Sequence, residues 1–307
     1  MKTQLFKPLG ISVLFTLFLV ACVQNETKKE VEKEEVTEKV APAKIAAPQP
    51  SPATTIKQVV GLTNITLNYS RPGMKGRTIF GNLVPFDKVW RTGANANTTI
   101  EFDTEITLGE TTVPAGKYAI YTKPGKDSWE VMLYSKTDNW GTPQTWDDAL
   151  VVAKTTAKSE QMPMPVESFM MVFDELTNSA GVLGILWENT YVGVPFTVPT
   201  DKTVMASIAT VMKGNPNEKA FYDAAVYYLA ENKDINQAVE WIDKAVEMGK
   251  NDPKYWMLRQ QSLIHTKAGK KETAIAAAKQ SLELAKKVGN ADYVKMNENS
   301  LKEWGAM

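Results

Sequence analysis

Basic, amide and aromatic side chains concentrate between residues 69 and 97, in a stretch that glycines interrupt. A guanidinium matches a planar carboxylate or phosphate with two parallel hydrogen bonds, and glycines let the backbone come close to a ligand. Amides add neutral hydrogen bonds, and a tryptophan offers a face on which a sugar ring stacks. The pattern therefore predicts a site for an anionic or glycan ligand. The candidate binding residues are Arg71, Lys75, Arg77, Trp90, Arg91, Asn95 and Asn97.

The same residue types also suit a structural role. Arg-Pro-Gly and Thr-Gly-Ala-Asn are good loop sequences, and an arginine can hold a loop through backbone carbonyls or through an acid such as Asp87 or Asp103. Trp90 and Phe86 fit a hydrophobic core as well as they fit a ligand platform. A ligand site and a loop framework are therefore alternatives for this stretch.

Two tryptophans, Trp140 and Trp146, stand in one short polar segment. Such a pair can stack on sugar rings, or it can hold its own loop over the core. Paired carboxylates about 5–9.5 Å apart would allow hydrolysis without His or Cys, but the sequence brings no two acids together. The acids considered are Glu101, Asp103, Glu105, Asp147, Asp148, Asp174, Glu175 and Glu188. We predict no catalytic residue, no metal ligand and no cofactor.

Composition excludes several classes of protein. The chain has 307 residues with one Cys and one His, too few for a disulfide scaffold, a Cys/His zinc cluster or most His-based triads. Basic and acidic residues both number 35, so the formal charge is zero, and we expect no nucleic-acid partner. Hydrophobic residues are 43% and charged residues 23%, which is ordinary for a globular protein.

The N-terminus predicts export and a lipid anchor. Lys2 and Lys7 precede an uncharged run over residues 9–21, which is shorter than the ~20 apolar residues of a spanning helix. It ends in Leu-Val-Ala-Cys, which looks like a bacterial lipobox with Cys22 as the lipidated residue. We therefore predict a signal peptide over residues 1–21 and a lipid-anchored protein of the bacterial cell envelope. An uncleaved anchor or a plain signal peptide is the alternative.

Residues 22–54 are predicted to form a disordered stalk. Ten of the fourteen residues from Glu26 to Lys39 are charged, and four prolines follow between residues 41 and 52. Such a composition favours an extended spacer without a packed core.

Residues 55–200 have the pattern of an antiparallel β domain. Apolar residues alternate at Ile65, Leu67 and Tyr69, and turn sequences such as Gly109-Glu110 separate the short runs. Period-two alternation predicts half-buried strands. Many short strands with regular turns favour a β-sandwich or a jelly-roll-like barrel.

Two segments within this region resemble the signature of a bacterial family, the domain of unknown function 2911. They read YSRPGMKGRTIFG over residues 69–81 and LVPFDKVWRTGANAN over residues 83–97, and a hairpin at 115–118 and a strand at 129–131 also fit. The resemblance implies an exported protein of a type common in Bacteroidetes-like bacteria, often with helical repeats after the β domain. It implies no reaction and no catalytic residue.

After a linker at residues 201–214, residues 215–307 have helical periodicity. Ala238, Val239, Ala245 and Val246 recur 36 residues later as Ala274, Ile275, Ser281 and Leu282. Paired helices at this period resemble tetratricopeptide repeats. Such a stack binds a protein or peptide partner, or it only packs on and stabilises the β domain.

The sequence thus predicts an α+β chain of two domains, with a β-sandwich-like domain before a helical repeat domain. The leading functional hypothesis is a non-enzymatic ligand-binding or protein-assembly module, anchored to the membrane by its N-terminal lipid. A carboxylate-dependent hydrolase of envelope glycans and a purely structural envelope protein are the alternatives.

Overall fold

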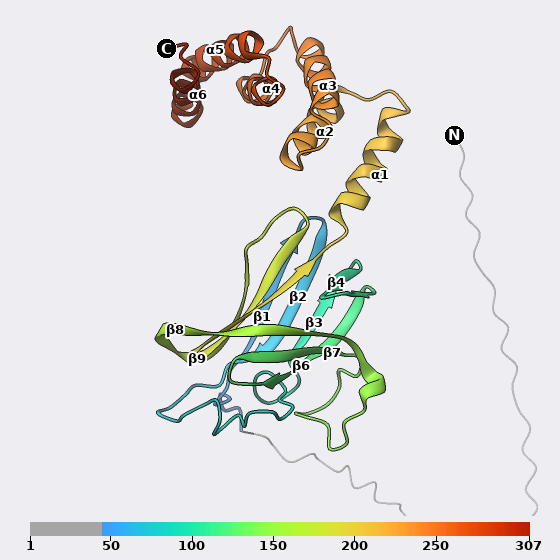
Figure 1. Ribbon diagram of the computed structural model, residues 1–307, viewed down its shortest axis with the longest axis vertical. Helices are drawn as coiled ribbons and strands as arrows, with labels where there is room; N and C mark the ends of the chain where they lie inside the picture. Colours follow the sequence, from blue (N-terminus) through green and yellow to red (C-terminus); the bar gives the residue numbers. More distant parts are fainter. Residues whose placement is uncertain (1–44) are drawn as a thin grey trace, which may run out of the picture. The chain divides into compact units, whose positions relative to one another are not determined.

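The computed structural model describes residues 45–307, which form a β part followed by six helices (Figure 1). The α+β architecture predicted from the sequence is therefore confirmed. The predicted signal peptide, the lipidation site Cys22 and most of the predicted stalk lie outside the described residues. Within the described range, no helix is long and apolar enough to cross a membrane.

Nine antiparallel strands make up the β part. They join in the order β1-β2-β3-β6-β7-β8-β9-β4-β5. Period-two burial is clear in β2, where Ile65 and Leu67 point into the core and Asn64 and Thr66 point away from it. The strands are β1 (Ala53–Val60), β2 (Thr63–Ser70), β3 (Thr99–Phe102), β4 (Ile106–Leu108), β5 (Thr111–Val113), β6 (Gly116–Pro124), β7 (Ser128–Tyr134), β8 (Val151–Asp174) and β9 (Ala180–Thr197).

The long strand β8 links two ladders. Its first residues, 151–158, pair with β7, and its later residues, 159–174, pair with β9. Between Gln161 and Val166 the register with β9 shifts, so that residues 162–165 form a bulge opposite Asn189. On the far side of β8, residues 180–197 form the single continuous strand β9.

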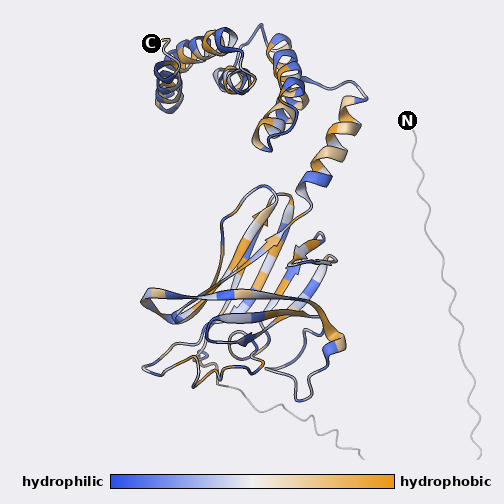
Figure 2. Cartoon of the chain, in the orientation of Figure 1, coloured by the Kyte–Doolittle hydropathy of each residue, from blue (hydrophilic) through white to orange (hydrophobic). Residues whose placement is uncertain are grey.

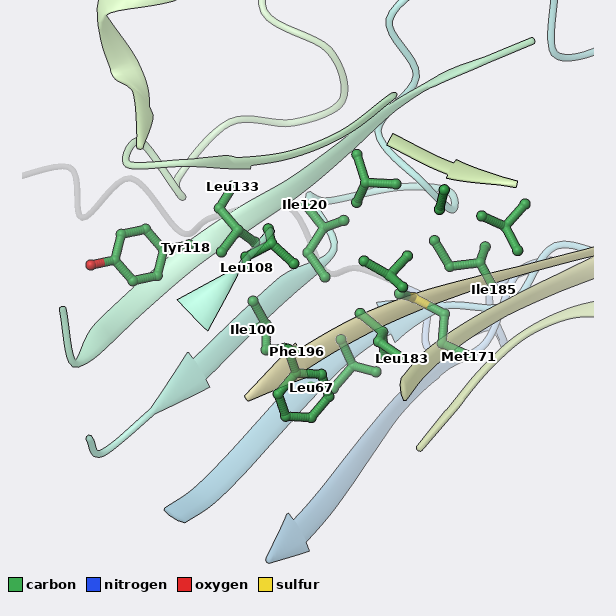
Figure 3. Close-up of a cluster of buried hydrophobic side chains, with 14 of the residues drawn as sticks. Leu67, Ile100, Leu108, Tyr118, Ile120, Leu133, Met171, Leu183, Ile185 and Phe196 are labelled. Atoms are coloured by element: carbon green, nitrogen blue, oxygen red, sulfur yellow. The ribbon is translucent and has the colours of Figure 1, made fainter. Parts of the chain in front are cut away.

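One hydrophobic core lies between strands of the two ladders. Leu67, Ile120 and Leu133 contribute to it from β2, β6 and β7, and Leu183 and Phe196 contribute from β9 (Figure 3). Hydrophobic and hydrophilic residues are interspersed along these strands (Figure 2). A smaller cluster, made of Ala119, Tyr121, Met132 and Tyr134, occupies the other face of β6 and β7. This second cluster supports the loops of the candidate site.

The helical part begins earlier than predicted, because residues 201–214, which we expected to be a linker, are mostly helix α1. Asn217 and Asp234 cap the next two helices with their side chains, and α3 ends at Gly249. The helices are α1 (Thr200–Met212), α2 (Glu218–Ala230), α3 (Ile235–Met248), α4 (Tyr255–Lys267), α5 (Lys271–Val288) and α6 (Ala291–Glu303).

The small residues that recur at a spacing of 36 all lie inside the helical part. Ala238 and Ala245 of α3 are fully buried, and so are their counterparts Ala274 and Ser281 of α5. Buried small side chains at these positions are compatible with closely packed helices, and a tetratricopeptide-like arrangement stays a prediction.

Candidate functional site

The signature loop, residues 71–97, is held largely by its own polar side chains. Arg71 Nε donates to the carbonyl oxygen of Phe169 over 3.0 Å. Arg77 donates from Nε to Met74 O (2.8 Å) and from Nη2 to Gly73 O (2.6 Å). Lys75 is exposed and adopts a left-handed backbone conformation. Two of the predicted ligand-binding cations therefore bind backbone carbonyls of the protein itself.

Trp90 lies in an aromatic cluster at the edge of the main core. Its ring stacks on Trp187 at 6.0 Å between centroids and meets Phe169 edge-on at 5.4 Å, while its Nε1 donates to Gly93 O. Asn95 Nδ2 donates to Ser51 O over 3.0 Å and so holds the start of the β part. These contacts are those of a loop framework, and ligand binding by Trp90 and Asn95 stays a prediction.

Asn97 connects the signature loop to a second loop, residues 135–147. When its amide is oriented to satisfy its neighbours, the nitrogen donates to Asn139 O (2.6 Å) and to Gly141 O (2.9 Å). The Tyr121 hydroxyl lies 3.2 Å from both Gly141 O and the Asn97 amide oxygen. Burial raises the pKa of Tyr121 above its ordinary value, so its proton is retained at neutral pH. Asn97 and Tyr121 thus hold the backbone on both sides of Trp140.

Trp140 and Trp146 have opposite roles in this second loop. Trp146 packs against Tyr121 and Tyr134, with ring centroids 5.3 and 4.7 Å away, and donates from Nε1 to Asp148. Trp140 is 76% exposed. Trp146 therefore anchors its own loop, whereas Trp140 presents its ring to solvent, and sugar stacking by Trp140 stays a prediction.

A groove of about 540 Å³ runs along Trp140. We call it the Trp140 groove. Its walls combine aromatic, amide and hydroxyl groups with one positive and one negative side chain, Lys136 and Asp147. The remaining lining residues are Tyr134, Asn139, Thr142, Pro143, Gln144, Thr145 and Leu150. An apolar platform with convergent polar groups is typical of a small-molecule site.

Arg91 lies against the same loop from its buried side. A Cβ atom on Gly141 would stand 2.5 Å from Arg91 Nη1. The Nε of Arg91 is buried without a hydrogen-bond partner among the described residues. The structure therefore brings Arg91 and Asn97 to the Trp140 loop, whereas Arg71, Lys75, Arg77, Trp90 and Asn95 serve other contacts.

One of the acids considered from the sequence, Glu188, lies in a second cleft, of about 490 Å³, together with Asp127 and Glu160. Glu188 has a left-handed backbone, with φ of +53°. Its carboxylate accepts from the backbone N–H groups of Ile79 (3.1 Å) and Phe80 (3.5 Å). Glu188 therefore holds the signature loop. In residues 45–307 no group of three or more His, Cys, Asp or Glu side chains has the arrangement of a metal site.

Sequence reasoning missed Tyr121, Asn139 and Gly141. Tyr121 belongs to an apolar strand run and gives no polar signal of its own, whereas Asn139-Trp140-Gly141 is a turn-like tripeptide with an aromatic centre. That tripeptide was the available signal for a presented tryptophan.

Comparison with known proteins gives one match. Residues 51–196 match the family model described as "Protein of unknown function (DUF2911)", a range that contains the signature loop, Tyr121 and the Trp140 groove. No curated protein and no solved structure matches the chain. This match supports the resemblance seen in residues 69–97 and shows that residues 51–196 are similar to the DUF2911 family.

Proposed function

We propose that this protein is a non-enzymatic saccharide-binding module of the bacterial cell envelope, and that the sugar binds in the Trp140 groove. The observation that carries the proposal is the exposed ring of Trp140 on a backbone fixed by Asn97 and Tyr121. Exposing a large apolar ring in water is unfavourable by itself. A ligand with an apolar face that covers the exposed ring of Trp140 would therefore bind with a favourable hydrophobic contribution.

Sugars combine an apolar C–H face with a rim of hydroxyl groups. Trp140 would contact that face, while Asn139, Gln144 and Thr145 offer amide and hydroxyl groups to the rim. Because the loop backbone is already held in place, little ordering entropy is lost on binding. The volume of about 540 Å³ is that of an ordinary ligand site.

The proposal also covers the N-terminal segment and the helical part of the chain. Lipidation at Cys22, followed by the stalk, would hold the β part outside the membrane surface. We further propose a β-sandwich-like arrangement for the β part and a tetratricopeptide-like arrangement for residues 215–307, with a protein or peptide partner on the helices. Replacing Cys22 by Ser tests the anchor, because it should abolish acyl labelling and recovery in the membrane fraction.

A glycan array probed with the full chain tests the binding proposal. The expected result is binding to a defined group of glycans, lost in Trp140→Ala with an unchanged melting temperature. Met164→Ala is the matched control, because Met164 is 74% exposed and lies in the β8 bulge, outside the lining of the groove. Equal binding by wild type and Trp140→Ala, or no binding to any glycan, would contradict the proposal.

The same glycans distinguish the hydrolase alternative. A hydrolase would release shortened products over time, and Glu188→Gln would stop their release. Intact recovery of every bound glycan supports the binding module.

A further inference from the structure

Arg91 differs from the other arginines of the signature loop. Arg71 and Arg77 each donate to backbone carbonyls. Among residues 45–307, no carboxylate lies within ion-pair distance of Arg91, and its buried Nε has no hydrogen-bond partner. The buried Nε of this guanidinium has lost contact with water without gaining a hydrogen-bond partner, which is unfavourable.

The position of Arg91 links this unpaired charge to the Trp140 groove. Its Nη1 lies so close to Gly141 that a Cβ there would stand 2.5 Å away. Gly141 lies between Trp140 and Thr142, and both of these residues line the groove. The guanidinium therefore lies beside Gly141, the chain neighbour of the exposed Trp140 at the edge of the groove.

The charges around the groove point to the kind of ligand. Lys136 and Asp147, which both line it, offset each other. Arg91 adds a positive charge that has no ion-pair partner among residues 45–307. A guanidinium recognises carboxylate and phosphate groups by the same paired hydrogen bonds.

We infer that the ligand of the Trp140 groove is an anionic saccharide, a sugar that carries a carboxylate or a phosphate. The ring of the sugar stacks on Trp140, and its anionic group pairs with Arg91. This inference rests on the proposed function, because it names the class of saccharide that the same groove takes.

Titration calorimetry with three matched tetrasaccharides tests the inference: cellotetraose, its 6-carboxylated form and its 6-phosphorylated form. The full chain should bind at least one anionic form about tenfold more tightly than the neutral form, as a charge-assisted hydrogen bond predicts. The anionic form that binds more tightly shows whether the site prefers a carboxylate or a phosphate. Raising NaCl from about 20 mM to about 500 mM should reduce this preference without weakening cellotetraose binding.

Two variants test whether Arg91 causes the preference for the anionic tetrasaccharide. Arg91→Met should remove it while cellotetraose still binds, and Arg77→Met, which removes a guanidinium bonded to Gly73 and Met74, should retain it. If Arg91→Met does not fold, the salt dependence of the wild-type preference for the anionic sugar tests the inference instead. Equal affinities for the three sugars, or a preference that survives Arg91→Met, overturn the inference while saccharide binding stands. Binding to none of the three sugars, together with no binding on the glycan array, overturns the proposed function as well.

Discussion

Replacing Asn97 by Ala removes the link between the two loops of the site. The Asn97 side chain is 7% exposed, and its amide nitrogen donates to Asn139 O and Gly141 O while its oxygen faces the Tyr121 hydroxyl. The variant leaves both carbonyls without this donor, although the backbone N–H of Asn97 still donates to Asn139 O over 3.4 Å and Tyr121 can still donate to Gly141 O. The backbone on either side of Trp140 then loses its side-chain support from Asn97.

The structure sets the size of the effect. Each lost hydrogen bond of this kind is worth about 0.5–1.5 kcal/mol, and two are lost, so Asn97→Ala should reduce the free energy of unfolding by about 1–3 kcal/mol. For a chain of this size, that corresponds to a fall in melting temperature of about 2–12 °C. Saccharide affinity should fall less than in Trp140→Ala, because the ring is still present but less well ordered.

Urea unfolding followed by tryptophan fluorescence, with calorimetric melting of the same samples, measures both quantities. Asn82→Ala is the control, because this exposed asparagine lies in the same loop. A change in Asn97→Ala no larger than the control, within about 0.5 kcal/mol, would show that the amide does not hold the Trp140 loop.

Two further predictions concern backbone geometry and pH. Gly81→Ala should lower the melting temperature more than Gly76→Ala. Both glycines have positive φ, but only at Gly81 would a Cβ atom meet a side chain, 2.6 Å from the Phe86 ring. Equal decreases of the two melting temperatures in thermal scans would refute the role of this steric clash. Burial acts to raise the pKa of Asp243, but the hydrogen bonds from His265 and Gln261, together with the electrostatic effects of His265 and Lys270, outweigh burial and lower the pKa. The stabilisation is therefore complete above the unfolded pKa of about 3.9 and is lost as the pH falls through the lower folded value. Asp243→Asn should abolish this component in urea midpoints measured between about pH 5 and pH 2, and an unchanged pH profile would contradict it.

Most of the fold follows from local pattern. Ile65 and Leu67 alternate with polar residues, and both are buried in β2 as expected. The first part of β8 could not be predicted in this way. Over residues 151–165 it buries only Ala153 and Ala157, and two prolines interrupt it. Pairing with β7 and β9 determines its conformation. Such long-range contacts do not require an alternating hydrophobic pattern in the local sequence.

The candidate site was predictable only in part, because it also depends on contacts between distant parts of the chain. The residue types near residue 97 and the exposed tryptophan segment were both recognised as candidates for sugar binding. Their connection was not recognised, because Asn97 reaches Asn139 and Gly141 through hydrogen bonds across more than forty positions of the chain. A single sequence carries the donors and acceptors but no sign of which of them meet.

The course of β8 through both ladders also bears on how the β part folds. Residues 151–158 complete one ladder and residues 159–174 begin the other, so the two ladders share one continuous strand. We expect this shared strand to couple the unfolding of the two ladders. A cut at the bulge of residues 162–165 would leave residues 151–158 paired with β7 in one fragment and residues 166–174 paired with β9 in the other, so β8 would no longer join the ladders covalently.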